Sequence, residues 1–452
     1  MQKITAFDIV MINIVSIVSL KNVPITSQCG FSIIFIYCVV SALFFIPGAV
    51  AVAELGTRFP QSGGISAWVN KAFGIKISSC VVFTQWMYNI IFFPTLAVFA
   101  TSQLSYFISH ILGVDVEFFT ENKIYVTLSA LSIFWLGVLI NSYGIIISSR
   151  MSSISAIFGV ILPIILIILL SVVWVFFDYE TKSTSQSFFN SNSNLALITI
   201  VFFSLVGIEV TAAHADKIEN ARNNFPKALY ITVCIVPIVM ILVNTLVYMV
   251  LPSSLISDRL GLIETFGVFS HKFNLNHMQY IVALMIAAGS FGCLSSWMIT
   301  LSKYFLKISE YGSFPKVFIK KNKNDVPVNI LVIQGIIYSA LCLIYLWMPS
   351  IKDAYLFLSA FSAQLALLAN AVFFMAAIKL RMNYKWQEAY QISKNKYFSI
   401  TLYLLGASSC FVAIMLGFLI IDIYVYYNSI CYLIVAGVLA VISSKLLFKL
   451  LR

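Results

Sequence analysis

Charged residues are scarce in this chain of 452 residues: Asp, Glu, Lys and Arg together make up 10% of it. Soluble globular domains carry about 25% of these residues. Hydrophobic residues reach 61%, and the mean hydropathy is +0.97. The composition therefore excludes an ordinary soluble protein and indicates a chain that lies mostly within a lipid bilayer.

Cysteine and histidine patterns that would bind a metal ion are also missing. The eight cysteines show no C-x-x-C spacing and no clustering with the four histidines. All but Cys29 lie within apolar runs. We therefore expect no disulfide framework, no metal site and no cofactor. The N-terminus has no small-residue cleavage site, so we expect the first helix to be retained and not removed as a signal peptide.

Long apolar runs dominate what is present. A helix needs about 20 apolar residues to cross the hydrocarbon core of a membrane. The sequence predicts about twelve such spans, joined by short turns rich in Asn, Ser, Pro and charge. Their approximate bounds are 6–27, 31–56, 77–108, 124–142, 151–177, 194–214, 228–251, 277–307, 328–348, 353–379, 398–421 and 425–448.

Lysine and arginine are distributed unevenly between the turns. With a cytoplasmic N-terminus, most of the 28 Lys and Arg residues fall on the cytoplasmic side. This asymmetry predicts that both termini are cytoplasmic. It also accounts for the net charge of +11, so no nucleic-acid partner is needed to explain it. The residues predicted to lie outside are Lys123, Lys182, Arg259, Lys272 and Lys352.

Few ionisable residues lie within the predicted spans, where each costs about 2.5–3.5 kcal/mol on the insertion scale and marks a candidate functional site. Asp8 suits the cytoplasmic surface at a helix start. Glu54 is a candidate gating or coupling residue, but it also suits a helix end at the interface, because a turn follows it. His214 is more typical of a packed histidine than of a metal ligand, since no second ligand stands at metal spacing.

The first predicted span is interrupted in "IVSIVSLKNVPITSQCG". Ser19, Lys21 and Asn22 are polar residues in an otherwise apolar run, and Pro24 follows them. Proline removes a backbone donor and disfavours helix at the residue before it. We therefore predict that this helix breaks near Lys21.

The sixth predicted span is interrupted in "SLVGIEV". Gly207 permits a break, and Glu209 can accept hydrogen bonds from the backbone donors that the break releases. The competing interpretation of Gly207 is close helix packing. Interrupted spans at matching positions of two halves indicate a transporter's central site, because bare helix ends bind carboxylates and amines.

The third span adds polar residues in "FTQWMYNIIFFPT". Gln85 and Asn89 are spaced i, i+4 and share one helix face. This face either points at the two breaks or makes an interhelical hydrogen bond, as polar residues in membrane helices commonly do.

Three stretches carry a resemblance to a known family. They are "FFIPGAVAVAELGTRFPQSGGISAWVNKAFG" (44–74), "FSLVGIEVTAAHADKIENARNNFPKAL" (203–229) and "SSWMITLSKYFLKISEYGSFPKVFIKKNKNDVPVNILVIQ" (295–334). The chain resembles the amino acid–polyamine–organocation (APC) transporters, and most of all the bacterial glutamate/GABA antiporter group.

The resemblance implies an all-α membrane fold of the leucine-transporter type. Helices 1 and 6 would be broken, and two inverted repeats would cover about 6–177 and 194–379, with peripheral helices at about 398–448. It implies a single transporter domain in the bacterial inner membrane that exchanges amino acids by alternating access.

Site residues follow from the resemblance by position. Phe203 would be the aromatic gate beside the substrate, and Gly207 and Ile208 would supply backbone at the break. Glu209 would couple the gate to neighbouring helices, or would act only as a structural tether. Ser19, Lys21 and Asn22 would complete the binding residues, with Gln85, Asn89 and Glu54 in gating or coupling roles.

Two departures from the antiporter pattern stand out. The first break reads "SLKNVP", which places Lys21 where that group has no cation. The C-terminal tail that plugs the inner mouth of the antiporter is missing, so the pH gating that such a tail provides is not expected. Lys21 then has three interpretations: pairing with a substrate carboxylate, a fixed cation in place of sodium, or a stem that reaches the outer surface.

Two other functions compete with the antiporter. One is a proton-coupled amino-acid importer of the same fold, with Lys21 or Glu209 carrying the proton. The other is a polytopic membrane enzyme or a channel. The chain shows neither a catalytic His/Asp/Glu or Ser/His cluster at one face nor the charged rings of a channel filter. The sequence leaves the amino acid carried and the oligomeric state open.

Overall fold

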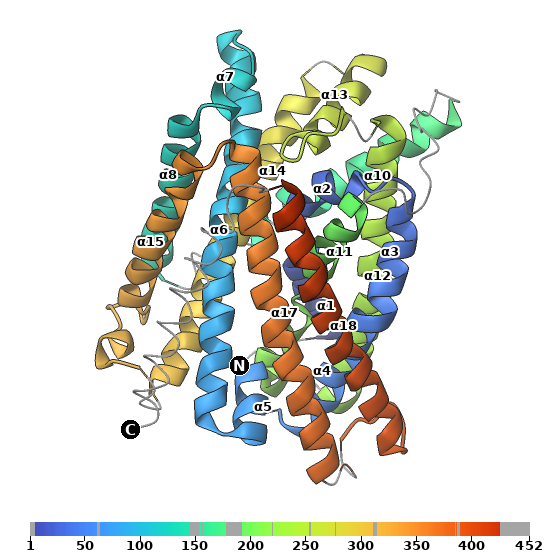
Figure 1. Cartoon of the computed structure of the whole chain (residues 1–452), viewed down its shortest axis with the longest axis vertical. Coiled ribbons are helices and arrows are strands. Elements are labelled where there is room, and N and C mark those ends of the chain that lie inside the picture. Colours follow the sequence, from blue (N-terminus) through green and yellow to red (C-terminus); the bar gives the residue numbers. More distant parts are fainter. Residues whose placement is uncertain are drawn as a thin grey trace.

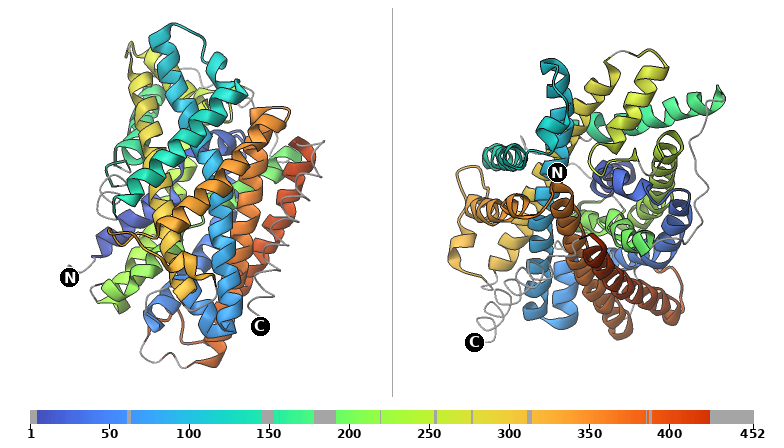
Figure 2. Two further views of the ribbon diagram at one scale, coloured as in Figure 1. Left: turned by 90° about the vertical axis from the view of Figure 1, so that its left-hand side faces the viewer. Right: turned by 45° about the horizontal axis from the view of Figure 1, so that its top comes forward.

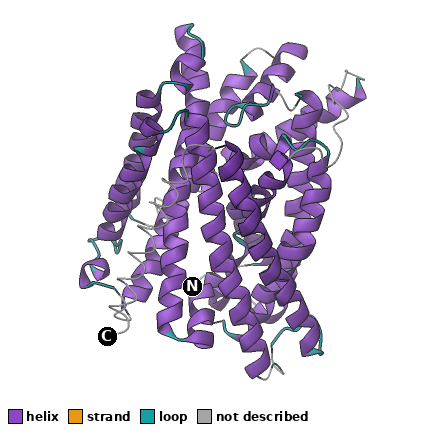
Figure 3. Ribbon diagram, in the orientation of Figure 1, coloured by secondary structure: helices purple, strands orange, loops and turns teal. Residues whose placement is uncertain are grey.

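The computed structural model describes residues 5–60, 64–144, 153–155, 157–177, 192–218, 220–252, 255–275, 277–310, 314–384, 386 and 389–424. Within these residues the chain forms helices and connecting loops, and it forms no β-strand (Figure 3). Most of the long helices run roughly along one direction (Figure 1).

Nine helical segments of the described chain are long and apolar enough to cross a membrane. Each coincides with a predicted span, and the bounds agree within four residues, except that α12 begins at Ala221, seven residues before the predicted start. The twelfth predicted span, 425–448, lies outside the described residues. The segments are α3 (Ser32–Val40), the π-helical η2 (Ser41–Phe45) and α4 (Ile46–Arg58); α6 (Ile75–Leu112); α8 (Lys123–Ser142); the π-helical η3 (Ile157–Ile161) and α10 (Leu162–Phe176); α12 (Ala221–Val250); α14 (Met278–Glu310); α15 (Val328–Cys342) and α16 (Ile344–Trp347); α17 (Ile351–Asn383); and α18 (Lys396–Tyr424).

The first and sixth predicted spans are broken, as the sequence predicts. The first consists of α1 (Ala6–Ile17), η1 (Leu20–Asn22) and α2 (Val23–Ser27). The sixth consists of α11 (Asn192–Ser204) and the 3₁₀-helical η4 (Ile208–Lys217).

The prediction of turns between the spans is wrong for four segments, which form short helices in the structure. These are α5 (Gly64–Phe73), α7 (Glu117–Thr120), α13 (Gly261–Lys272) and η6 (Lys316–Ile319). Helix α13 buries Leu262, Phe266 and Phe269, which recur every three to four residues on one face. A helix that is apolar on one face only does not read as a membrane span, so the hydropathy search misses it. Helices α7 and α13 lie at one end of the molecule and α5 at the other (Figure 1).

Helix α6 runs through the middle of the bundle, packed against α14 and α17 (Figure 2). On the other side of α14, η3 approaches so closely that a Cβ added to Gly159 would lie 2.2 Å from the Cα of Gly289. Small residues permit such backbone contact between membrane helices. This contact brings the fifth span against the eighth, where both line the cavity described below.

Candidate functional site

The first helix ends where its backbone turns extended. The last hydrogen bond of α1 runs from the backbone N–H of Val18 to the carbonyl of Ile14 at 2.8 Å. Ser19 then has φ −110° and ψ 108°, and the chain resumes as η1. Pro24 occupies the first turn of α2, where its missing N–H costs no helical hydrogen bond. The break therefore lies at Val18–Ser19.

The sixth span breaks at Gly207, which has φ 127° and ψ −6°. Residues other than glycine rarely adopt this backbone conformation. The N–H of Gly207 donates to Oε2 of Glu209 at 3.1 Å, and the Glu209 side chain is buried. A carboxylate thus satisfies a backbone donor that the break leaves without a helical partner, as the sequence predicts.

The two breaks lie against each other. A Cβ added to Gly207 would be 3.3 Å from a side-chain carbon of Ile17 and 3.5 Å from the carbonyl oxygen of Ser16. The hydroxyl of Thr211 donates to Oδ1 of Asn13 at 3.1 Å. These contacts tie η4 to α1, so the two interrupted spans share one site.

A small central pocket of about 40 Å³ lies between the breaks. Its walls come from both broken spans, from α6 and from α14. The residues that line it are Ser16, Ile17, Val18, Ser19, Asn22, Tyr88, Asn89, Phe92, Phe203, Ser204, Val206, Cys293 and Trp297.

A larger inner cavity of about 430 Å³ shares Ser19, Cys293 and Trp297 with the central pocket. It extends to Met11 in the first half of α1 and to Thr300, well along α14. Small-molecule sites have volumes of about 300–1,000 Å³, so this space is large enough for a small ligand. A side pocket of about 20 Å³ lies between Gln85 and Glu209, also against Trp297.

Lys21 lines the inner cavity and is 1% exposed. Its Nζ donates to Oγ of Ser359 at 3.0 Å and lies 4.8 Å and 5.0 Å from the ring centres of Phe92 and Tyr355. Among the described residues, no carboxylate lies within ion-pair distance of it. The interpretation that its stem reaches the outer surface is wrong, because α17 and α6 enclose the ammonium group.

The remaining predicted binding residues are partly brought together. Ser19, Asn22 and Phe203 line the central pocket, where the Phe203 ring packs 5.3 Å from that of Phe92. Gly207 and Ile208 line neither the pocket nor the cavity, and they contribute the backbone of the break.

The predicted polar face of α6 points at the breaks. Asn89 lines the central pocket and Gln85 lines the side pocket with Glu209. The side-chain amide of Asn89 also donates to the carbonyl of Gln85 at 2.9 Å, within its own helix. Their roles in gating or coupling stay predictions.

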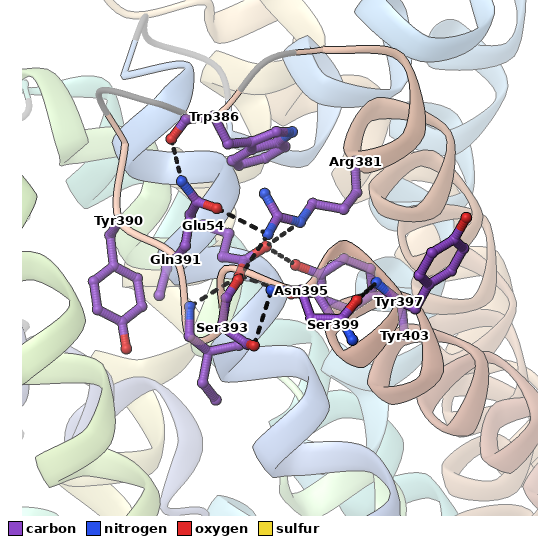
Figure 4. Close-up of polar contacts among 12 residues, drawn as sticks. Glu54, Arg381, Trp386, Tyr390, Gln391, Ser393, Asn395, Tyr397, Ser399 and Tyr403 are labelled. Carbon is purple, nitrogen blue, oxygen red and sulfur yellow. Dashed lines mark hydrogen bonds and ion pairs between the residues drawn. The ribbon is translucent and has the colours of Figure 1, made fainter.

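Glu54 lies in a different place, at the end of α4 (Figure 4). It is fully buried, one turn before α4 ends at Arg58, and its role in gating or coupling stays a prediction. One carboxylate oxygen lies 3.4 Å from Nε of Arg381 and accepts from the Tyr403 hydroxyl at 2.6 Å. The other accepts from the Ser399 hydroxyl at 2.9 Å. Glu54 therefore joins α4 to α17 and α18, and it does not line the pocket.

Sequence reasoning misses several residues at the site, and two of them, Trp297 and Ser359, show why. Trp297 lines the central pocket, the inner cavity and the side pocket; it lies inside a motif that carries the resemblance, and that motif is the signal that could have found it. Ser359 lies 338 residues from Lys21 in the sequence, and no local pattern connects the two. In the described part of the chain, no three metal-ligating side chains come together. The side chains of Asp8 and His214 lie outside the described residues.

Comparisons with known proteins agree with this geometry. A family model described as amino acid permease matches residues 4–441. An uncharacterized transporter of Legionella pneumophila is 35% identical over 92% of this chain and 89% of its own length. A glutamate/gamma-aminobutyrate antiporter of Lactococcus lactis is 25% identical, over 74% of this chain and 67% of its own. Putrescine transporter PotE of Escherichia coli is 24% identical, over 68% and 67%.

A solved structure shares the fold. The crystal structure of MhsT in complex with L-phenylalanine matches with a TM-score of 0.60 at 15% identity, covering 91% of this chain and 97% of that one. At this identity the match speaks for the fold alone. The predicted leucine-transporter-type fold is thereby confirmed.

Proposed function

The chain belongs to the amino acid permease family and is a secondary transporter, and from this premise we propose that it exchanges small amino acids held by their carboxylate groups. A transporter of this family moves its substrate and does not transform it. The proposed exchange runs by alternating access, with the central pocket opening to each side in turn.

The observation that carries the proposal is the buried ammonium group of Lys21. A buried charge without an opposite charge is strongly unfavourable, and a substrate carboxylate would supply the missing partner. Ser359 and the Oδ1 of Asn22 accept neutral hydrogen bonds from Nζ at 3.0 Å and 3.5 Å, which leaves one donor of the ammonium group for a ligand. The start of η1 adds backbone N–H groups and a positive dipole end beside Ser19.

The positive charge of Lys21 also helps to decide which of two relatives is the better guide to the substrate. The Lactococcus protein is named a glutamate/gamma-aminobutyrate antiporter, and PotE is named a putrescine transporter. Putrescine is a dication, which a lysine beside the pocket would repel. Both glutamate and gamma-aminobutyrate carry a carboxylate, so the first relative is the better guide to the substrate.

Residue roles in this proposal follow from where the side chains lie. Phe203 closes the central pocket from one wall, and Asn22 contacts the substrate from η1. Glu209 holds the break of the sixth span, and through the side pocket it links that break to Gln85. The division into two inverted repeats, 6–177 and 194–379, is part of the same proposal.

The distribution of Lys and Arg supports an orientation with both termini in the cytoplasm, in a bacterial inner membrane. The end of the molecule that holds Glu54 and Arg381 then faces the cytoplasm. The end that holds α7 and α13 then faces outward.

A proton-coupled importer is the second candidate. It is favoured by two ionisable groups at the breaks, Lys21 and Glu209, either of which can carry a proton. Counterflow in proteoliposomes separates the two functions. An exchanger takes up labelled substrate only when unlabelled amino acid is inside, whereas an importer needs an inward proton gradient.

The substitution Lys21→Met tests the role of the ammonium group. We expect uptake of glutamate and gamma-aminobutyrate to fall at least tenfold, because one charge-assisted hydrogen bond is worth about 1.5–3 kcal/mol. The matched control is Lys76→Met, at an exposed lysine near the start of α6.

Two results would contradict the carboxylate assignment. The first is a Lys21→Met variant that transports every substrate like the parent. The second is a variant that gains dependence on sodium and keeps its substrate range, which would identify Lys21 as a fixed cation in place of a bound ion.

A further inference from the structure

Three basic side chains are buried in the part of the chain that the structure describes. They are Lys21, Arg259 and Arg381, at 1%, 8% and 2% exposure. Both arginines lie beside a carboxylate of the protein itself: Arg259 pairs with Glu121, and Arg381 lies 3.4 Å from the buried carboxylate of Glu54 (Figure 4). Lys21 takes part in none of the ion pairs that the described residues form. Among these residues, the buried cation without an acid partner is therefore the one at the transport site.

Glu209 is the acid at the other break, and it does not serve as the partner of Lys21. Its carboxylate accepts from the backbone N–H of Gly207 at 3.1 Å and lines the side pocket. Of the described residues that line the inner cavity, Lys21 is the only charged one, and those that line the central pocket include no charge. These residues thus provide no permanent counter-charge in the two spaces next to Lys21.

The neighbours of the ammonium group come from three spans and are all neutral. Asn22 lies beside it in η1, and Ser359 belongs to α17. The ring faces of Phe92, in α6, and Tyr355, in α17, lie within 5.0 Å of Nζ. Neutral acceptors and ring faces stabilise a cation less than a carboxylate does. Lys21 therefore lies where the first, third and tenth spans meet, with only partial compensation of its charge.

The hydration of Lys21 must change during the transport cycle. Alternating access passes through a stage in which the site is closed to both sides. The inner cavity reaches Lys21, so water can hydrate the ammonium group while that cavity is open. Closure expels this water, and a buried charge without an opposite charge is strongly unfavourable. A substrate carboxylate beside Nζ removes the penalty, whereas an empty site keeps it.

We propose that the charge of Lys21 makes exchange obligatory: the transporter closes and reorients readily with a substrate carboxylate beside Lys21, and it is held back when the site is empty. This inference rests on the proposed exchange function and deepens it. It assigns to Lys21 the coupling between the exit of one substrate and the entry of the next. A tenfold difference in the rate of closure needs only about 1.4 kcal/mol.

The experiment compares two kinds of efflux from proteoliposomes loaded with saturating labelled glutamate. One is efflux into medium without amino acid, which requires the empty transporter to return. The other is efflux into medium with saturating unlabelled glutamate, which does not. Valinomycin with equal potassium on both sides and a protonophore remove electrical and proton gradients. The ratio of the second rate to the first is independent of the amount of protein, and we expect about tenfold or more for the parent.

Ser359→Asp is the decisive variant, because it supplies a built-in carboxylate where Oγ of Ser359 lies 3.0 Å from Nζ of Lys21. An internal counter-charge should let the empty transporter close, so we expect the ratio to fall to about threefold or less. The matched control is Ser359→Asn, which has nearly the same shape as the aspartate but no charge. Its absolute rates can change, since it contacts the site, but its ratio should stay at that of the parent.

Lys21→Met gives a second test that does not depend on a new acid in the membrane. It removes the charge itself, so the ratio should again fall to about threefold or less, whatever happens to the affinity for substrate. Agreement between Lys21→Met and Ser359→Asp would show that the uncompensated charge, and not the lysine side chain as such, holds the empty transporter back.

Four results would overturn the proposal. A high ratio in the parent and in both charge variants would leave exchange intact and remove Lys21 as its cause. An equal fall in Ser359→Asn and Ser359→Asp would assign the effect to the size of the side chain. Loss of both kinds of efflux in both charge variants would show that neutralising the charge does not free the empty transporter. A ratio near one in the parent, or no glutamate efflux at all, would reject the proposed function as well.

Discussion

Gly207 and Glu209 form the hydrogen bond that ties together the break in the sixth span: the backbone N–H of Gly207 donates to the Glu209 carboxylate at 3.1 Å. The break exists because Gly207 adopts φ 127°, and the acid two residues later satisfies the donor that the turn exposes. Gly207 therefore permits the break in the helix, and Glu209 stabilises the backbone conformation of that break.

Removing the carboxylate tests this tie. We expect Glu209→Ala to lower transport at least tenfold, because it leaves the Gly207 N–H buried without an acceptor, at a cost of about 1–3 kcal/mol. Glu209→Gln keeps an acceptor oxygen and should retain more activity than the alanine variant. Initial uptake rates, scaled to the amount of protein in the membrane, measure both. Equal activity of Glu209→Ala and the parent would show that the tie is dispensable.

Gly207→Ala tests the conformation of the break itself. The added Cβ is strained at this φ and lies 3.3 Å from Ile17, so we expect a clear loss of transport with normal insertion. Gly207→Leu should abolish transport. The matched control is Gly113→Ala, because Gly113 has φ 65° and nothing within 4 Å of an added Cβ. Similar losses at both glycines would mean that strain alone, and not the site, explains the result.

The Glu54–Arg381 pair is expected to matter for stability. Breaking a buried ion pair by removing one partner costs about 3–5 kcal/mol, because the other charge is left unpaired. Glu54→Gln and Arg381→Met should each lower the unfolding temperature in detergent by several degrees, and the double variant should lose less than the sum. Lys321→Met, which breaks an exposed pair, serves as control. Strict additivity would argue against direct coupling of the two charges.

Titration of Glu264 should contribute to the pH dependence of the protein's stability. This residue lies in α13, outside the membrane-spanning segments. Burial raises the pKa of Glu264, although the backbone N–H of Ser257 donates to its carboxylate. A pKa raised by folding means that the stabilising contribution is full at low pH and is lost as the pH rises through the folded-state pKa.

The variant Glu264→Gln removes that titration. Its unfolding temperature relative to the parent should therefore increase from pH 4.5 to pH 7.5. Glu117→Gln, at an exposed acid of α7, should show no such trend. A constant difference between Glu264→Gln and the parent across this range would contradict the expectation.

The sequence by itself determined the positions of eleven of the predicted spans and of both breaks. Hydropathy over about 20 residues is a local property, and so is the effect of Pro24 or Gly207 on the backbone beside it. The tie between Glu209 and Gly207 was also predictable, because the two residues are only two positions apart. The short helices α5 and α13 were missed, since their apolar faces are too narrow for a hydropathy window.

Only the tertiary structure decided how the charges are partnered. Lys21 meets Ser359 across 338 residues, and Asp258 meets Gln28 across 230. The neighbours of Glu54 in the chain indicated that a helix ends there, whereas only the packed structure places its partners on α17 and α18. A charged group in a membrane protein must find a partner wherever the packed helices bring one near. Helix packing sets that partner, and it depends on the depth, tilt and rotation of helices far apart in sequence, which no local pattern records.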